Sequence, residues 1–112
     1  MSWTVHISDA AQQDFNNIID WTIEQFGDHQ ATVYAGVLVA AISELDDGPQ
    51  QLGIKARDDI GKGMFTMHVA RHHRKGRHFV MLRVADHEKR VIEVVRLLHD
   101  AMDLPRHLPK PE

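Results

Sequence analysis

Two amphipathic helical patterns separated by one glycine constrain the fold more than any other feature of this chain. The first pattern starts at a cap residue, Ser8 or Asp9, and runs to Phe26, after which Gly27 ends the helix. At 100° per residue its apolar stripe consists of Ala11, Phe15, Ile18, Ile19, Thr22 and Phe26.

The second helical pattern follows at once. It is capped by Asp28 and closed by Asp47-Gly48-Pro49. Its core stripe consists of Ala31, Tyr34, Ala35, Leu38, Ala41, Ile42 and Leu45. Because a single residue joins the two long helices, we expect an antiparallel helical hairpin.

Strand patterns lie on both sides of this hairpin. Before it, Trp3, Val5 and Ile7 alternate with polar residues, which indicates a short strand with one covered face. After it, residues 48–63 contain several glycines and no sustained period, so we expect a loop. Three strands are then predicted at residues 64–71, 77–84 and 90–98, with turns at Lys75-Gly76 and at residues 86–89.

The last of these strands is the clearest, because it contains the β-branched run Val91, Ile92, Val94 and Val95. Beyond it, Leu104-Pro105 stops any helix that residues 100–102 begin. The order strand, helix, helix and three strands predicts an α+β fold, in which the helical hairpin packs on one face of a mainly antiparallel sheet.

Length and composition favour one domain over residues 1–112, since 112 residues with 43% apolar content suit a single modest core. The absence of cysteine excludes disulfides, thiolate chemistry and cysteine-ligated zinc. The N-terminus lacks the pattern of a signal peptide, and no window approaches the roughly 20 apolar residues of a membrane span. We therefore expect a soluble cytoplasmic protein with no membrane partner.

Charge is segregated along the chain. Residues 1–54 contain eight acids and no lysine or arginine, whereas all 13 basic residues and the other eight acids follow. The first part therefore carries −8 and the second 13 − 8 = +5. Two interpretations stay open: an acidic helical layer that faces a basic sheet, or a dipolar molecule that attracts partners of opposite charge to its two ends.

The densest basic segment is residues 71–78, RHHRKGRH, with four cations, three histidines and no acid. It is either a solvated turn at a sheet edge or a phosphate-binding site. Its adjacent His72 and His73 would point to opposite faces of a strand, and no cysteine or paired carboxylate completes a ligand set, so we expect no metal site. No other cofactor is indicated.

Arg83 and Arg96 lie inside apolar strands, where a charge is costly unless it is paired or faces a groove. One alternative pairs them with Glu93 or Asp86. The other gives them a role in contacting a target.

Four segments of the chain resemble the ParE-type toxins of the RelE/ParE toxin-antitoxin superfamily: SDAAQQDF, WTIEQFG, GRHFVMLRVAD and, most specifically, the ending LLHDAMDLPRHL. The resemblance implies the RelE/ParE fold and a partnership with a cognate antitoxin, ParD-like or of another type, in a hetero-oligomer. It also implies inhibition of DNA gyrase without catalysis, and no specific DNA binding by the toxin alone. The target-binding residues it suggests are Arg71, Arg74, Arg77, Arg83, Arg96, His99 and Arg106.

A ribosome-dependent mRNA endonuclease of RelE type is the alternative, and an inactive orphan binding module is a third. For the endonuclease, Arg83, Arg96 and His99 would be the catalytic residues. The chain departs from those relatives because its only tyrosine, Tyr34, is predicted on the second helix and Leu82 replaces an aromatic residue. The gyrase inhibitor is therefore favoured.

Some apolar residues lie outside the core stripes of the helices. They are Trp21 on the first helix, and Val33, Val37 and Ala40, which form a line on the second. A wholly buried helix pair would explain them. In view of the resemblance, we favour a surface that receives an amphipathic antitoxin helix.

Overall fold

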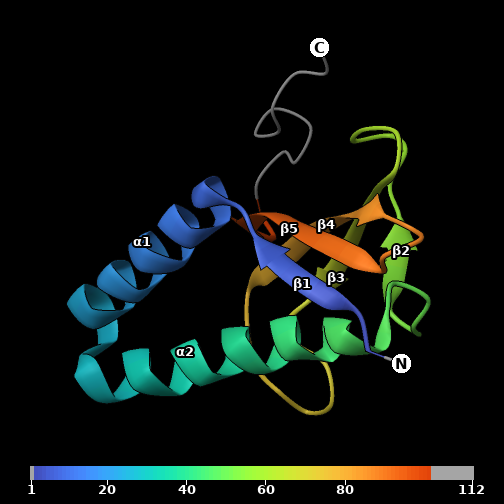
Figure 1. Ribbon diagram of the computed structural model, residues 1–112. Coiled ribbons are helices and arrows are strands. Elements are labelled where there is room, and N and C mark those ends of the chain that lie inside the picture. Colours follow the sequence, from blue (N-terminus) through green and yellow to red (C-terminus); the bar gives the residue numbers. More distant parts are fainter. Residues whose placement is uncertain (1, 102–112) are drawn as a thin grey trace.

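The computed structural model describes residues 2–101, and these form a helical hairpin packed on a five-stranded sheet (Figure 1). The elements are β1 (Thr4–Ile7), α1 (Asp9–Phe26), α2 (Asp28–Ser43), a 3₁₀ turn η1 (Glu44–Asp47), β2 (Ile54–Ala56), β3 (Met64–His68), β4 (His78–Asp86) and β5 (Val91–His99). The sheet order is β1-β5-β4-β3-β2. Only β1 runs parallel to its neighbour, and the other pairs are antiparallel. The α+β prediction is confirmed, with one strand more than expected.

Local signals in the sequence explain the helix boundaries. The Ser8 hydroxyl caps α1 by accepting the Ala11 N–H at 3.0 Å, and it donates to the Val95 carbonyl at 2.8 Å. Gly27 ends α1 with a φ of 90°, which a residue with a Cβ rarely adopts, and it is also the N-cap of α2. Asp28, predicted to be the cap, is instead the first residue of α2. The second helix ends at Ser43, so Leu45 is buried from η1.

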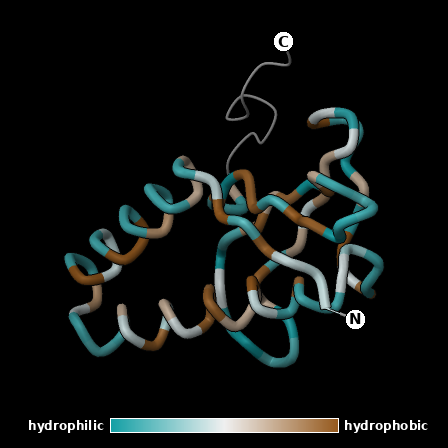
Figure 2. The backbone as a smooth tube through the Cα atoms, in the orientation of Figure 1, coloured by the Kyte–Doolittle hydropathy of each residue, from teal (hydrophilic) through white to brown (hydrophobic). Residues whose placement is uncertain are grey.

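The main core lies between the hairpin and one face of the sheet. Apolar residues recur along both helices and along the strands (Figure 2). The buried cluster consists of Ala11, Leu38, Ala41, Leu45, Met67, Val69, Val80, Leu82, Ile92, Val94 and Leu97. The opposite face, called here the helix-free face, carries a smaller cluster in which Met81 and Leu98 pack with Ile60 and Phe79. Successive residues of β4 thus pack on opposite faces of the sheet, Val80 and Leu82 in the main core and Met81 on the helix-free face.

The segment between helices and sheet was predicted less well. Residues 54–56, predicted as loop, form β2, because a three-residue edge strand is too short to show a period, and its pairing with β3 decides its conformation. The strand β3 ends at His68, three residues early. The turn lies at His72 and His73, which both have positive φ, rather than at Lys75-Gly76.

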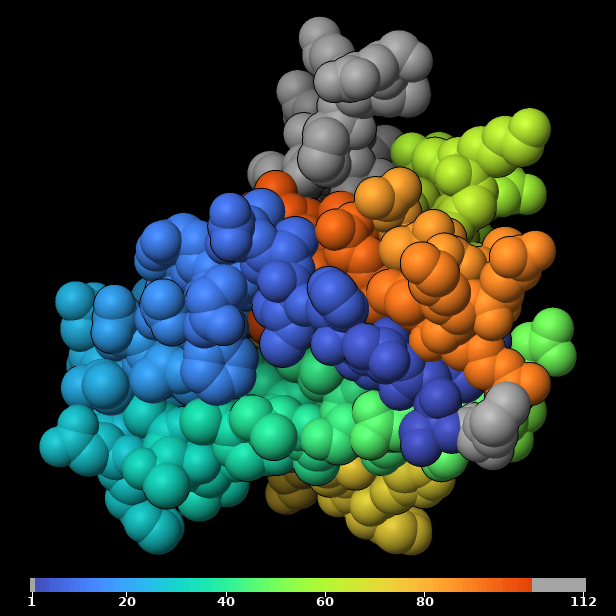
Figure 3. All heavy atoms as spheres, viewed as in Figure 1, coloured from blue at the N-terminus to red at the C-terminus, as the bar shows by residue number. Residues whose placement is uncertain are grey.

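Phe26 was wrongly placed in the core. It is 63% exposed, because the hairpin extends beyond the sheet and no strand packs against the end of α1 (Figures 1 and 3). All eight acids of residues 1–54 lie on α1, α2 or η1, and every described lysine and arginine lies on the sheet or its connecting loops. The interpretation of an acidic helical layer and a basic sheet is therefore confirmed for the described residues. None of the described helices is long and apolar enough to cross a membrane.

Candidate functional site

A pocket of about 330 Å³ lies at the β2 edge of the sheet. Lys55 and Thr66 are register partners on β2 and β3, and His68 and Phe79 are register partners on β3 and β4. The side chains of these two neighbouring pairs meet at the pocket. The pocket is lined by Gly53, Lys55, Arg57, Thr66, His68, Ala70, Arg71 and Phe79. Four of these side chains are basic and none is acidic, which suits an anionic group.

The cations of the pocket differ in how they are held. Arg57 makes a bidentate ion pair with Asp59, at 2.9 and 3.0 Å, on the protein surface. Arg71 donates to the Leu52 carbonyl at 2.8 Å and lies 3.1 Å from Glu44. Lys55 makes no ion pair with any described residue, so its ammonium group is available to a ligand.

Glu44, on η1, anchors the basic segment of residues 71–78 to the helical layer. Its carboxylate pairs with both Arg71 and Arg74, and His72 lies 3.7 Å away. One carboxylate thus serves two guanidinium groups that are both largely buried. The side chains of His73 and Lys75 stay exposed. The segment is therefore neither a freely solvated turn nor a simple row of available cations.

A second group of ionisable residues gathers where β4 begins and β5 ends. His78 and His99 are register partners, with ring centroids 5.3 Å apart. The Tyr34 hydroxyl of α2 lies 2.6 Å from His78 Nδ1 and accepts the Arg77 backbone N–H at 3.1 Å. Burial raises the pKa of Tyr34, so its hydroxyl keeps its proton and donates to His78 Nδ1. His78 is consequently neutral with its own proton on Nε2.

The same group continues onto the helix-free face. His68 Nε2 lies 3.0 Å from Asp100, and Arg77 pairs with the same carboxylate. Hydrogen bonds from His68 and Arg77 lower the pKa of Asp100. His68 Nδ1 accepts the Ala70 N–H at 3.0 Å, just as His99 Nδ1 accepts the Ala101 N–H at 3.1 Å. Each of the three histidines therefore uses Nδ1 as an acceptor. We call Tyr34, His68, Arg77, His78, His99 and Asp100 the sheet-end cluster.

The two arginines of the apolar strands have acidic partners. Arg83 pairs with Glu93 at 2.8 Å, as one of the two alternatives predicted. For Arg96 the predicted partners Glu93 and Asp86 are wrong, since it pairs with Asp14 of α1 at 2.7 and 2.9 Å. The hydrogen bonds to Asp14 raise the pKa of Arg96. The pair forms because α1 lies along the edge of β5 beyond the end of β1.

The residues suggested for an endonuclease do not converge. His99 pairs with His78, and Arg83 lies five residues further along β4, about 16 Å away and on the opposite face. Sequence reasoning missed Tyr34, because its place on a helix concealed its contact with the sheet. His78, which Tyr34 contacts, was noted in the sequence only as one of the three histidines of the basic segment. No group of three or more acidic or histidine side chains within residues 2–101 is arranged to hold a metal ion.

The burial of His78 predicts a pH dependence of stability. Desolvation, and then the neighbouring His99, lower its pKa from 6.5 to about 4, with smaller effects of His68, Asp14 and Asp100. The unfolded chain binds a proton at a pH where the folded one does not, so the stabilisation is complete above 6.5 and is lost as pH falls toward 4. We expect the free energy of unfolding in urea to be about 1 to 2 kcal/mol lower at pH 5 than at pH 7.5. A His78→Gln variant should lose most of this difference, and an exposed His6→Gln control should retain it.

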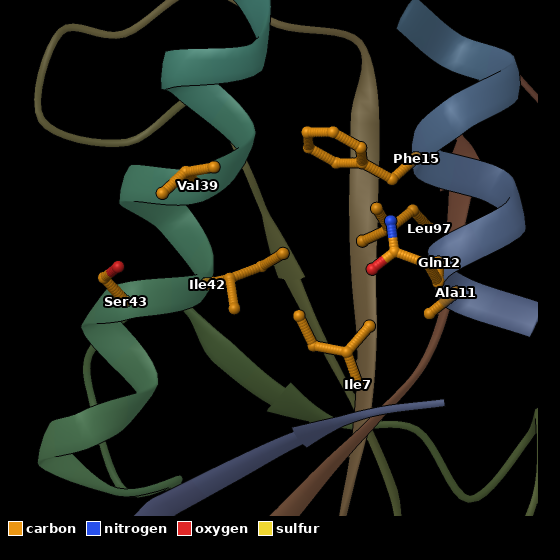
Figure 4. A pocket seen from close by; sticks show the side chains of 8 residues that line it. All are labelled: Ile7, Ala11, Gln12, Phe15, Val39, Ile42, Ser43 and Leu97. Atoms are coloured by element: carbon orange, nitrogen blue, oxygen red, sulfur yellow. The ribbon is translucent and has the colours of Figure 1, made fainter. Parts of the chain in front are cut away.

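An apolar groove of about 300 Å³ lies between the two helices (Figure 4). Phe15, Gln12 and Ala11 of α1 face Val39, Ile42 and Ser43 of α2, while Ile7 of β1 and Leu97 of β5 complete the lining. Val39 and Ile7 are 53% and 45% exposed. Sequence reasoning missed Val39, which lies outside the core stripe on the side opposite to Val33, Val37 and Ala40.

The residues predicted to contact an antitoxin differ in burial. Trp21 and Val33 are 56% and 50% exposed. Val37 and Ala40 are half-buried, and Val37 packs against the main core. The predicted target residue Arg106 lies outside the described residues.

Solved structures with the same fold define the class of protein. The chromosomal ParDE toxin-antitoxin system from P. aeruginosa superimposes with a TM-score of 0.71 at 18% identity, covering 87% of this chain and 95% of that chain. The RelBE2 toxin-antitoxin complex from Mycobacterium tuberculosis gives 0.59 at 19% identity, covering 88% and 99%. The fold is that of the ParE/RelE toxins.

The family model of the ParE toxin of the type II toxin-antitoxin system parDE matches residues 5–104. The chain belongs to this family, and it is a type II toxin of the ParE/RelE superfamily. A search of curated proteins gave no match.

Proposed function

We propose that this protein arrests growth by inhibiting DNA gyrase in the cytoplasm, without catalysis, and that a cognate antitoxin neutralises it. The observation that carries the proposal is the match of the ParE family model over residues 5–104, which includes the first part of the C-terminal motif, residues 97–104. The arginines of the sheet and of its basic segment, with His99 and Arg106, form the proposed target-binding surface. Several of them are already paired within the chain, so the target must compete with or add to those pairs.

Expression of the protein without its antitoxin is expected to arrest growth. In a supercoiling assay, the purified protein should inhibit gyrase at stoichiometric concentrations, because a non-catalytic inhibitor acts by occupancy. Ribosome-bound mRNA should stay intact. Rapid mRNA cleavage with unaffected supercoiling would contradict the proposal.

The antitoxin is proposed to bind the helical hairpin by placing an apolar helix in the groove between α1 and α2. An amphipathic helix binds such a groove through apolar residues at helical spacing. The exposure of Val39 and Ile7 supports this location, because an exposed apolar groove is a common mark of a protein interface.

Three charge substitutions on α2 separate binding from folding. Val39→Asp should weaken antitoxin binding at least about 30-fold, or 2 kcal/mol, while the melting temperature changes little. Val33→Asp tests the surface predicted from the sequence in the same way. Val37→Asp is expected to destabilise the isolated fold, because Val37 packs on the core. Calorimetry and thermal melts give both quantities, and unchanged affinity in Val39→Asp would remove the groove from the interface.

The sheet-end cluster supports a second candidate, an mRNA endonuclease. In this reaction a 2′-hydroxyl loses its proton to a base and attacks the adjacent phosphorus, while an acid gives a proton to the departing 5′-oxygen. His78 or His99 can serve as the base once its Nδ1 is released from the Tyr34 hydroxyl or the Ala101 N–H, and Tyr34 and Arg77 lie beside them. The His99→Gln variant should abolish mRNA cleavage if this candidate is correct, and should leave gyrase inhibition partly intact if the first one is.

A further inference from the structure

Two exposed aromatic rings touch at the free end of the helical hairpin. Trp21 and Phe26 are 56% and 63% exposed, and their ring centroids lie 5.9 Å apart at an edge-on angle of 71°. This end of the hairpin extends away from the sheet (Figure 1). Exposed Trp and Phe side chains in contact are unusual on the surface of a soluble domain and are typical anchors of protein interfaces.

Acidic side chains surround this aromatic pair. Asp20 and Glu24 lie on α1 next to Trp21, and Asp28 begins α2 beyond Phe26; all three are exposed and make no ion pair with another described residue. Residues 1–54 contain no lysine or arginine that could neutralise them from the same helices. The aromatic pair therefore lies in an uncompensated negative field.

Helix stability does not account for this arrangement. The last turn of α1 contains no basic residue, and Glu24 lies near the C-terminus of the helix, where a negative charge opposes the macrodipole. An acid at this position slightly destabilises the helix. A role in binding explains both the exposed rings and the unfavourable charge.

We propose that this surface, the hairpin tip formed by Asp20, Trp21, Glu24, Phe26 and Asp28, binds a protein segment whose apolar anchor is flanked by lysine or arginine. The anchor covers the two rings, and the flanking cations pair with the three carboxylates. Nucleic acid and anionic membranes are repelled by the same charges. The proposal goes beyond gyrase inhibition and does not depend on it.

The hairpin tip is separate from the groove. The three residues of α1 that line the groove precede Trp21 by ten, nine and six residues, so Trp21 points about 80°, 180° and 120° away from Ala11, Gln12 and Phe15 around the helix. A partner at the tip and an antitoxin helix in the groove therefore contact different sides of α1. The two can be bound together.

A pair of short synthetic peptides tests the proposal on the full chain. One carries a Phe-Leu anchor flanked by lysines, and its twin carries glutamates in place of the lysines. The chain has two tryptophans, so two-dimensional NMR shows two indole N–H signals, and a Trp21→Phe variant assigns them. The lysine peptide should shift the Trp21 signal and leave that of half-buried Trp3 unchanged. Trp21→Ala should weaken its binding at least about tenfold.

Charge reversal at two exposed positions provides the matched control. The double variant Asp20→Lys with Glu24→Lys should keep its melting temperature and should prefer the glutamate peptide over the lysine peptide. Retained preference for lysine, equal binding of both peptides, or no shift of the Trp21 signal would each overturn the proposal. Concentration-dependent shifts without any peptide would also overturn it, because they would assign the surface to a second copy of the chain.

Discussion

Replacing Asp14 by alanine should lower the free energy of unfolding by about 3 kcal/mol. The carboxylate accepts two hydrogen bonds from Arg96, at 2.7 and 2.9 Å, and one from the Leu97 backbone N–H at 3.0 Å. Its side chain is only 13% exposed. Without it, a partly buried guanidinium loses its carboxylate partner, and an N–H at the edge of β5 loses its acceptor. Urea unfolding measures the change, and the melting temperature should fall by about 10 °C.

Asp20→Ala is the matched control for this variant. Asp20 lies on the same helix, is exposed and has no ion pair with another described residue, so its replacement should change stability by less than about 0.5 kcal/mol. The double variant Asp14→Ala with Arg96→Leu should recover part of the loss, because it also removes the positive charge that Asp14 compensates. A loss below about 1 kcal/mol in Asp14→Ala would show that water replaces the carboxylate.

The Glu44→Gln substitution is expected to cost about 2 to 3 kcal/mol and to loosen the basic segment. Glu44 is the shared partner of Arg71 and Arg74, whose side chains are largely buried, so the neutral amide leaves two guanidinium groups close together. Stability should therefore fall, and amide hydrogen exchange should accelerate between residues 69 and 77.

Asp46→Asn provides the comparison for Glu44→Gln, since Asp46 lies on the same 3₁₀ turn and its side chain is exposed. It should change neither stability nor exchange by a measurable amount. Equal effects of the two substitutions would mean that the net charge of the turn, rather than the two arginine contacts, matters.

The contact between Tyr34 and His78 removes one argument for gyrase rather than mRNA as the target. Sequence reasoning favoured gyrase partly because the only tyrosine lay on a helix. The structure brings that hydroxyl to 2.6 Å from a histidine at the end of the sheet. The position of Tyr34 on a helix therefore no longer argues against an endonuclease, and the choice of gyrase depends on family membership.

The helical hairpin, the β5 strand and the α+β class could be predicted from the sequence, because each depends on contacts or periods within a few residues. Ser8 caps its own helix, Gly27 supplies the positive φ that the turn requires, and the β-branched run of Val91 to Val95 favours a strand wherever it lies. The segregation of charge also follows directly from the order of residues along the chain. The structure contains all of these features, although α2 ends at Ser43 and β5 spans Val91–His99.

Only the tertiary structure decided which charges are paired and which apolar residues are covered. Asp14 and Arg96 are 82 residues apart, and Tyr34 and His78 are 44 apart, so no local pattern could connect them. Phe26 belongs to the core stripe by periodicity, yet it is exposed because the sheet ends before the hairpin does. Burial depends on what another part of the chain places opposite a residue, and the helical period specifies only the side on which that residue lies.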